Sequence, residues 1–97
     1  MKVLITAEAD LESIGDYIAR GNPARALSFV HELYQLCLDI AEMPQAWPVA
    51  PRYEHHGIRR RVYGRYLIFY RAGADQITVL HILNGAMDVE TILFPDG

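Results

Sequence analysis

Residues 58–71 read IRRRVYGRYLIFYR, and this stretch decides the fold. Ile58, Arg60 and Val62 alternate with Arg59 and Arg61, as in a strand that presents two different faces. Residues 63–64 supply a turn, and residues 65–71 are mostly aromatic or aliphatic, so they form a second strand. So short a connection predicts an antiparallel hairpin. After the turn at 72–75, residues 76–83 are again rich in strand formers and extend the hairpin to three strands.

The N-terminal third changes from strand to helix. Residues 2–6 are short and apolar and predict a strand. From Ala7 the apolar residues recur at helical spacing with acidic residues between them, which predicts an amphipathic helix. We expect Thr6 to cap this helix and Gly21 to end it.

A second helix is predicted over residues 23–42. Asn22 is a favoured N-cap, Pro23 is favoured at the first helical position, and Pro44 stands just beyond the end. Its apolar stripe consists of Ala26, Phe29, Val30, Leu33, Cys37, Ile40 and Ala41. Because little chain separates the two helices, we expect an αα-hairpin.

Residues 44–57 predict a long loop, rich in proline, that Trp47 pins to the core. Residues 88–94 predict a short helix capped by Asp88, with a final strand as the alternative. The order is β-α-α-β-β-β, an α+β fold whose helical hairpin packs on one face of a small antiparallel sheet. We expect Leu67 and Phe69 to face the helices, and the other face to be left for water or a partner.

Length and charge limit the function. The 97 residues form a single domain, 1–97, without an apolar run long enough to span a membrane. Cys37 is the only cysteine, which fits a reducing cytoplasm. The net charge of −3 argues against a protein that grips nucleic-acid phosphates over its whole surface. A local basic face remains possible, because five arginines crowd residues 59–71.

Those arginines are the first candidate for a binding site. Arg59 and Arg61 share one strand face, Arg60 takes the other, and Arg65 lies across the turn. They form either a solvated edge or a docking patch for an acidic partner, since the guanidinium binds carboxylates through paired hydrogen bonds. Tyr66 and Tyr70 share a strand face and are either core residues or aromatic anchors for a partner.

Histidines offer the only candidate acid–base chemistry. His81 lies within a strand, where a structural hydrogen bond is the simpler interpretation. It is also a candidate residue for target or antitoxin binding. His55 and His56 are adjacent, so their side chains point in different directions and make a poor metal pair. The sequence therefore predicts neither a metal site nor a cofactor.

Several segments together resemble the ParE branch of the RelE/ParE toxin superfamily. They are Ala9–Ile14 and Tyr17–Ala19, Asn22–Ala26 with Phe29-Val30, Gly57–Arg60, Tyr63–Arg71, and Val79–Leu83 with Gly85 and Asp88. The resemblance covers nearly the whole chain and implies the same β-α-α-β-β-β fold. It implies a toxin that poisons DNA gyrase by binding, without catalytic residues, and forms a hetero-oligomer with a ParD-like antitoxin whose flexible amphipathic tail folds onto it. Contact with DNA would then be indirect, through the antitoxin.

The chain departs from the family pattern after the last strand. The family commonly has His-Gly-Ala-Arg-Asp or His-Gln-Arg-Met-Asp there, and this chain has Asn84-Gly85-Ala86-Met87-Asp88. We therefore add Asn84 and Met87 to the candidate residues for target or antitoxin binding. An attenuated toxin that acts only with its antitoxin in operon regulation is one alternative. A RelE-like ribosome-dependent endoribonuclease is the other, although Leu67 and Met87 occupy the places where that branch carries basic or aromatic residues.

Overall fold

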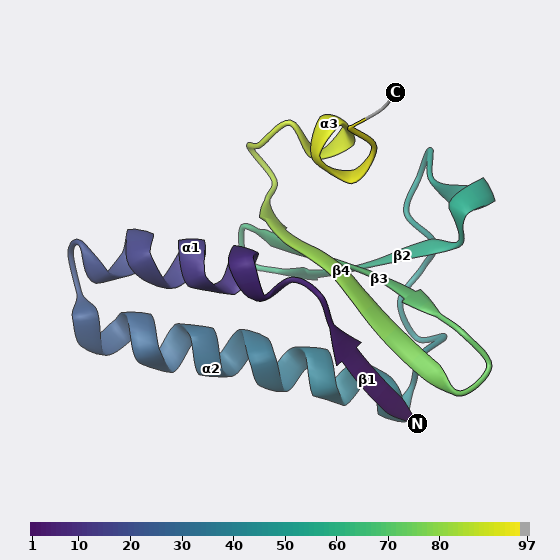
Figure 1. Cartoon of the computed structure of the whole chain (residues 1–97), viewed down its shortest axis with the longest axis horizontal. Helices are drawn as coiled ribbons and strands as arrows, with labels where there is room; N and C mark the ends of the chain where they lie inside the picture. The colour runs from purple at the N-terminus through teal and green to yellow at the C-terminus, as the bar shows by residue number, and fades with distance from the viewer. Residues whose placement is uncertain (96–97) are drawn as a thin grey trace.

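A computed structural model describes residues 1–95 of the chain (Figure 1). The strands are β1 (Lys2–Ile5), β2 (Ile58–Tyr63), β3 (Tyr66–Ala72) and β4 (Gln76–Asn84). The helices are α1 (Glu8–Ala19), α2 (Pro23–Asp39) and α3 (Val89–Leu93), with 3₁₀ turns at Ile40–Glu42 and Glu54–His56. The β-α-α-β-β-β order and the short C-terminal helix are as predicted. None of the helices in the described part of the chain is both long and apolar enough to cross a membrane.

The sheet has the strand order β1-β4-β3-β2. β2 pairs with β3, and β3 with β4, in antiparallel fashion, as their short connections predicted. β1 lies parallel to β4, pairing Lys2 with Gln76 and Ile5 with Val79. The sheet was predicted to be antiparallel and is in fact mixed, because β1 lies at its edge and runs in the same direction as β4.

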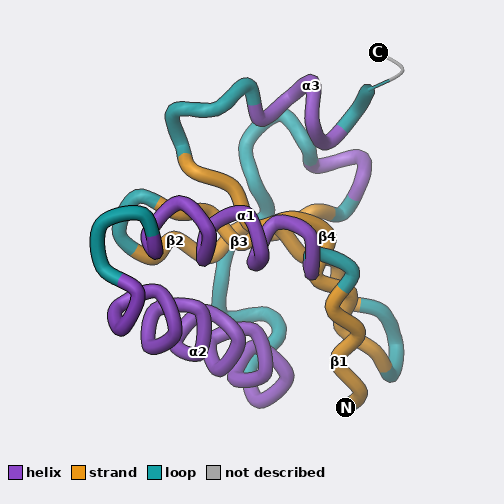
Figure 2. The backbone as a smooth tube through the Cα atoms, turned by 60° about the vertical axis from the view of Figure 1, so that its left-hand side comes forward, coloured by secondary structure: helices purple, strands orange, loops and turns teal. Residues whose placement is uncertain are grey.

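The two long helices lie side by side as an antiparallel hairpin (Figures 1 and 2). Asn22 caps α2 through its side-chain oxygen, which accepts the Arg25 N–H at 3.0 Å, and Pro23 takes the first helical position. Thr6 does not cap α1. Its hydroxyl donates to the Val79 carbonyl at 2.8 Å and joins the end of β1 to β4 instead.

One sheet face packs on the hairpin. Leu33, Cys37 and Ile40 of α2 and its extension are completely buried against Ile68 and Tyr70 of β3. The prediction that Leu67 and Phe69 face the helices is wrong, because their neighbours on β3 do so. Tyr70 tolerates burial because its hydroxyl donates to the Pro44 carbonyl at 2.8 Å, which leaves only its apolar ring to be covered.

The opposite face carries a second, smaller core. Phe69, Ile58 and Leu83 are buried there, with Ala50 of the loop. Tyr53, Val89, Ile92, Leu93 and Phe94 pack over them. The strands accordingly lie between α2 and α3 in both views (Figures 1 and 2). This part of the second face is covered by the chain itself, contrary to the prediction that it was open.

Candidate partner-binding surface

Arg59 and Arg61 share one face of β2, as the alternation predicted. That face meets the two helices, and both side chains are engaged within the fold rather than forming an open edge or docking patch. Arg59 donates to the Trp47 carbonyl at 2.7 Å and to Gln45 Oε1 at 2.8 Å. Arg61 donates to the Leu36 carbonyl at 3.1 Å, and its guanidinium carbon lies 4.2 Å from the Trp47 ring centroid. These two arginines hold the long loop and the end of α2 against the sheet.

The other candidate arginines differ in accessibility. Arg60 faces the second core's side of the sheet and is half-buried, and its backbone N–H donates to the Pro48 carbonyl at 3.1 Å. Arg65 is exposed at the β2–β3 turn. Of the predicted basic patch, Arg65 therefore stays most accessible to a partner.

Arg65 lies beside a groove that gathers three further predicted residues. We name it the turn groove: a hollow of about 330 Å³ between α1 and the end of β4. It is lined by Asp10, Ser13, Ile14, Tyr17, Tyr66, Ile82, Leu83, Asn84 and Met87. The Gly85 N–H donates to the Arg65 carbonyl at 2.9 Å, which ties the turn that carries Arg65 to the one that carries Met87.

The groove has exposed apolar rims. Tyr17 is 68% exposed and Met87 is 49% exposed, whereas Tyr66 is half-buried against the Phe29 ring at a centroid distance of 5.4 Å. Asn84 stabilises the turn that follows β4, because its Oδ1 accepts the Ala86 N–H at 2.9 Å. Large side chains that are both apolar and accessible are typical of partner-binding surfaces.

Tyr70 lies elsewhere. It is fully buried in the main core, so its ring is not available to a partner in the folded protein. Sequence reasoning placed Tyr17 in a segment that resembles the family but missed it as a binding residue, because periodicity alone does not show that an aromatic side chain on a helix is exposed. One signal could have found it. Tyr17 lies four residues after Ser13, so the two side chains share one side of α1, next to the apolar stripe that faces the core.

His81 takes part in a structural cluster at the edge of β4. β4 extends beyond its pairing with β1, and the Ile82 N–H donates to Asp10 Oδ2 at 3.0 Å. The same carboxylate oxygen lies 2.8 Å from His81 Nδ1. A register shift pairs Phe69 with His81 and Tyr70 with Val79, so Leu80 is a bulge that turns Ile82 toward the hairpin.

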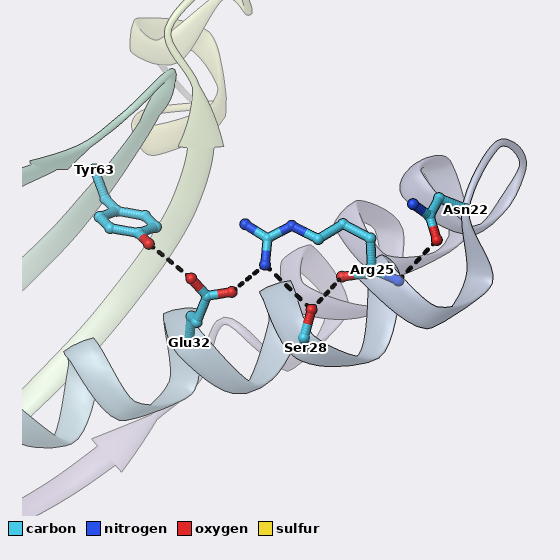
Figure 3. A network of polar contacts seen from close by, with 5 residues as sticks. All are labelled: Asn22, Arg25, Ser28, Glu32 and Tyr63. Atoms are coloured by element: carbon cyan, nitrogen blue, oxygen red, sulfur yellow. Dashed lines mark hydrogen bonds and ion pairs between the residues drawn. The ribbon is translucent and has the colours of Figure 1, made fainter.

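A polar network runs along α2 toward the β2–β3 hairpin (Figure 3). Arg25 contacts Ser28 and forms an ion pair with Glu32, and the Tyr63 hydroxyl donates to Glu32 Oε1 at 2.9 Å. The hydrogen bond from Tyr63 lowers the pKa of Glu32, and the Arg25 contact adds to that effect. The same bond to Glu32 raises the pKa of Tyr63. The network links α2 to Tyr63, the last residue of β2 before the β2–β3 turn.

A larger hollow of about 640 Å³ lies between the long loop and α3. His55 and His56 are on its wall, and the His56 ring stacks on Phe94 at a centroid distance of 4.5 Å. The exposed pair Arg52–Glu90 spans it at 4.0 Å. Within residues 1–95, no three His, Cys, Asp or Glu side chains lie close enough to hold a metal ion.

Comparison with known proteins agrees with this fold. A model of the family described as "ParE toxin of type II toxin-antitoxin system, parDE" matches residues 3–89. Among solved structures, a chain of the "Chromosomal ParDE TA system from P. aeruginosa" superposes with a TM-score of 0.75. It is 22% identical, and the match covers 87% of this chain and 95% of that chain, so it speaks for the fold alone. A search of curated proteins found no significant match.

Proposed function

Since the chain belongs to the ParE toxin family of type II toxin–antitoxin systems, we propose that it inhibits DNA gyrase by binding it directly. A ParD-like antitoxin neutralises it in a toxin–antitoxin hetero-oligomer. The protein acts in the cytoplasm, where gyrase works. Any contact with DNA is made through the antitoxin, because a net charge of −3 disfavours a direct phosphate-binding surface.

The observation that carries this proposal is the character of the turn groove. It combines exposed Tyr17 and Met87 with Arg65 at the adjacent turn. Tyrosine and arginine are over-represented among residues that dominate protein–protein affinity, and methionine adapts its shape to a partner. Asp10, the carboxylate in the lining, already accepts the Ile82 N–H and contacts His81. The groove is therefore better suited to binding than to acid–base catalysis.

A supercoiling assay tests the proposal. Purified protein is added to gyrase with plasmid and ATP, and inhibition of supercoiling is expected, with trapped cleavage complexes. Met87→Glu puts a charge on the apolar rim and should weaken inhibition by about tenfold or more, as expected for a contact near the centre of an interface. Met43→Glu is the matched control, because Met43 is 62% exposed and lies outside the groove lining.

Two results would count against this proposal, one against the target and one against the binding surface. Unchanged supercoiling at high toxin excess would contradict the target itself. Equal loss of inhibition by both methionine variants would contradict the groove as the binding surface. Normal growth on expression without an antitoxin would favour the attenuated toxin that the residues at 84 and 87 suggested.

One observation favours the ribonuclease alternative. The His81–Asp10 pair resembles a base with its orienting carboxylate, and the His81 side chain is one-third exposed. If the protein cleaves mRNA, site-specific cuts should appear in a translating extract and disappear with His81→Ala. Cleavage that persists in this variant would show that the pair is structural.

A further inference from the structure

The outer edge of β4 loses its neighbouring strand partway along its length. β1 pairs with β4 only as far as Val79, whose carbonyl accepts the Thr6 N–H at 3.0 Å. The chain then leaves this edge to begin α1 at Glu8. In the part of the chain that the structure describes, no strand continues the pairing from Val79 to Asn84. An edge of this kind presents backbone groups with which another chain can pair.

The hydrogen bonds to the other neighbour, β3, show which residues turn their backbone groups to the open edge. Antiparallel strands bond through every second residue. The Gly85 N–H donates to the Arg65 carbonyl at 2.9 Å, so residues 83 and 85 turn toward β3. Ile82 and Asn84, which alternate with them, therefore turn outward. The Ile82 N–H agrees with this phase, because it donates to Asp10 Oδ2 at 3.0 Å on the α1 side.

Two of these four outward groups are already engaged, and two are not. Asp10 holds the Ile82 N–H, and the Asn84 carbonyl accepts the Met87 N–H at 3.0 Å. Among residues 1–95, neither the Ile82 carbonyl nor the Asn84 N–H has a hydrogen-bond partner. Both residues line the turn groove, and Ile82 is only 1% exposed. Backbone groups without a partner are rare where little water reaches, so the groove contains a donor and an acceptor that a ligand can satisfy.

The two unengaged groups fit an added strand that runs parallel to β4. In a parallel pair, one residue of the added strand donates its N–H to one carbonyl and accepts the N–H found two positions further along. The Ile82 carbonyl and the Asn84 N–H have this spacing, on either side of Leu83. An antiparallel strand would need both groups of one residue, so it would have to displace Asp10 from Ile82 or share the Asn84 carbonyl with Met87.

We propose that the turn groove binds gyrase by strand addition: a short extended segment of gyrase pairs with β4 across Leu83, in the direction that β1 takes. Side chains alternate along a strand, and Leu83 belongs to the second core. The residues on either side of the pairing residue therefore point to the opposite face, where Tyr17 and Tyr66 line the groove. The segment has apolar side chains at these two positions and a residue other than proline between them, since proline has no N–H for the Ile82 carbonyl.

This inference rests on the proposed function for the identity of the partner, and it adds how the partner is held. Two variants of the full chain test it. Asn84→Pro removes the N–H that the added strand would bond, whereas Asn84→Ala keeps it and is the matched control, because both lose the Oδ1 contact with the Ala86 N–H. Proline is tolerated where its N–H does not enter a ladder, and Leu83 before it already lies in a strand. Inhibition of supercoiling and the melting temperature are measured for each variant.

A second measurement needs no variant. Amide hydrogen exchange of the wild-type chain is followed residue by residue, alone, with gyrase, and with the antitoxin. It reports the Asn84 N–H directly, and the Ile82 N–H serves as the internal reference because Asp10 holds it already in the free protein. If Asn84→Pro does not fold, the exchange measurement decides by itself.

The proposal expects a difference between the two variants and a local change in exchange. Asn84→Pro should inhibit gyrase about tenfold or more weakly than Asn84→Ala at similar melting temperatures, because a carbonyl of the gyrase segment is left without its donor. Exchange of the Asn84 amide should slow by about tenfold or more when gyrase is added, and exchange of the Ile82 amide should change less. Contacts made by side chains alone would produce neither effect.

Three results overturn it. Equal inhibition by the two variants, or unchanged Asn84 exchange while the wild type inhibits gyrase, excludes strand addition and leaves the proposed function intact. Protection of the Asn84 amide by the antitoxin and not by gyrase would assign this edge to the antitoxin. Failure of the wild type to inhibit gyrase at all would overturn the proposed function and, with it, the partner named here.

Discussion

Individual side chains in this protein have roles that alternation along a strand does not distinguish. Arg61 and Arg65 are four positions apart in the same hairpin, yet Arg61 stacks on Trp47 and donates to the Leu36 carbonyl while Arg65 is exposed. Tyr63 and Tyr70 share the hairpin-facing side of the sheet, and each hydroxyl has a different acceptor, Glu32 and the Pro44 carbonyl. What each residue does depends on which distant segment supplies its partner.

Replacing Arg61 with methionine should destabilise the fold. The variant keeps the apolar stem but loses a charged hydrogen-bond donor and the contact with Trp47, so the free energy of unfolding should fall by about 1–3 kcal/mol. Urea denaturation followed by Trp47 fluorescence measures it. Arg65→Met is the control and should change stability by no more than about 0.5 kcal/mol, because that side chain is exposed. Equal losses in both variants would contradict the distinction between the two arginines.

Tyr63→Phe should raise the pKa of Glu32 toward its ordinary value of 4.5, because the hydroxyl that stabilises the carboxylate is removed. A lowered carboxyl pKa contributes stability above that ordinary value and loses it as the pH falls through the folded-state pKa. The variant should therefore lose less stability on acidification. Carboxyl-carbon NMR titration of Glu32 checks the shift, with Tyr66→Phe as the control. An unchanged Glu32 titration in Tyr63→Phe would show that Arg25 alone sets it.

Among the elements, α3 shows how a short segment gains order from its surroundings. A helix of five residues is not stable on its own, and α3 is held by the Asp88 cap and by Val89, Ile92 and Leu93 on the second face of the sheet. The long loop contributes Tyr53 and Ala50 to the same small core. The loop and α3 therefore depend on each other, although strands β2, β3 and β4 separate them along the chain.

Phe94→Ala should loosen this second core without unfolding the first. Phe94 is half-buried, with its ring 5.3 Å from Tyr53 and 4.5 Å from His56 between centroids, so a loss of about 1–2 kcal/mol is expected. Hydrogen exchange should speed up in residues 50–57 and 89–94 more than in α2. Glu90→Ala in the same helix removes only an exposed ion pair and should be nearly neutral. Uniform acceleration across the whole chain would mean that the two cores unfold together.

At the scale of the whole molecule, each face of the sheet carries its own hydrophobic core. The hairpin side holds the larger core around Leu33, Cys37 and Tyr70, where burial raises the pKa of the Cys37 thiol to about 11 and keeps it protonated. The other side is closed by the loop and α3. The turn groove beside α1 stays accessible.

Leu33→Asp should prevent stable folding. Leu33 is completely buried at the centre of the larger core, and an unpaired charge there ranks among the most destabilising changes known for a domain of this size. Leu27→Asp on the same helix is the matched control, since Leu27 is 79% exposed, and it should melt within a few degrees of wild type. Circular dichroism melts of both variants decide the matter. A soluble Leu33→Asp protein that melts like wild type would show that the core assignment is wrong.

The sequence by itself determined the elements of this protein. Asn22 and Asp88 marked the starts of α2 and α3, the apolar stripe of α2 marked its buried face, and the arginine alternation marked the two faces of β2. Sequence segments also indicated the family, whose model matches residues 3–89. These signals are local, since caps, turns and periodicity act over a few residues.

Only the tertiary structure decided how these elements meet. β1 pairs in parallel with β4 across more than seventy residues of chain, and no local pattern encodes that pairing. Both faces of β3 are apolar, so alternation could not show that Ile68 and Tyr70, rather than Leu67 and Phe69, face the hairpin. The Leu80 bulge, the binding of Asp10 to the edge of β4 and the capture of Arg59 and Arg61 by backbone carbonyls likewise depend on distant partners. A side chain's hydrogen-bond partner is fixed by packing in three dimensions, and packing is a property of the whole chain.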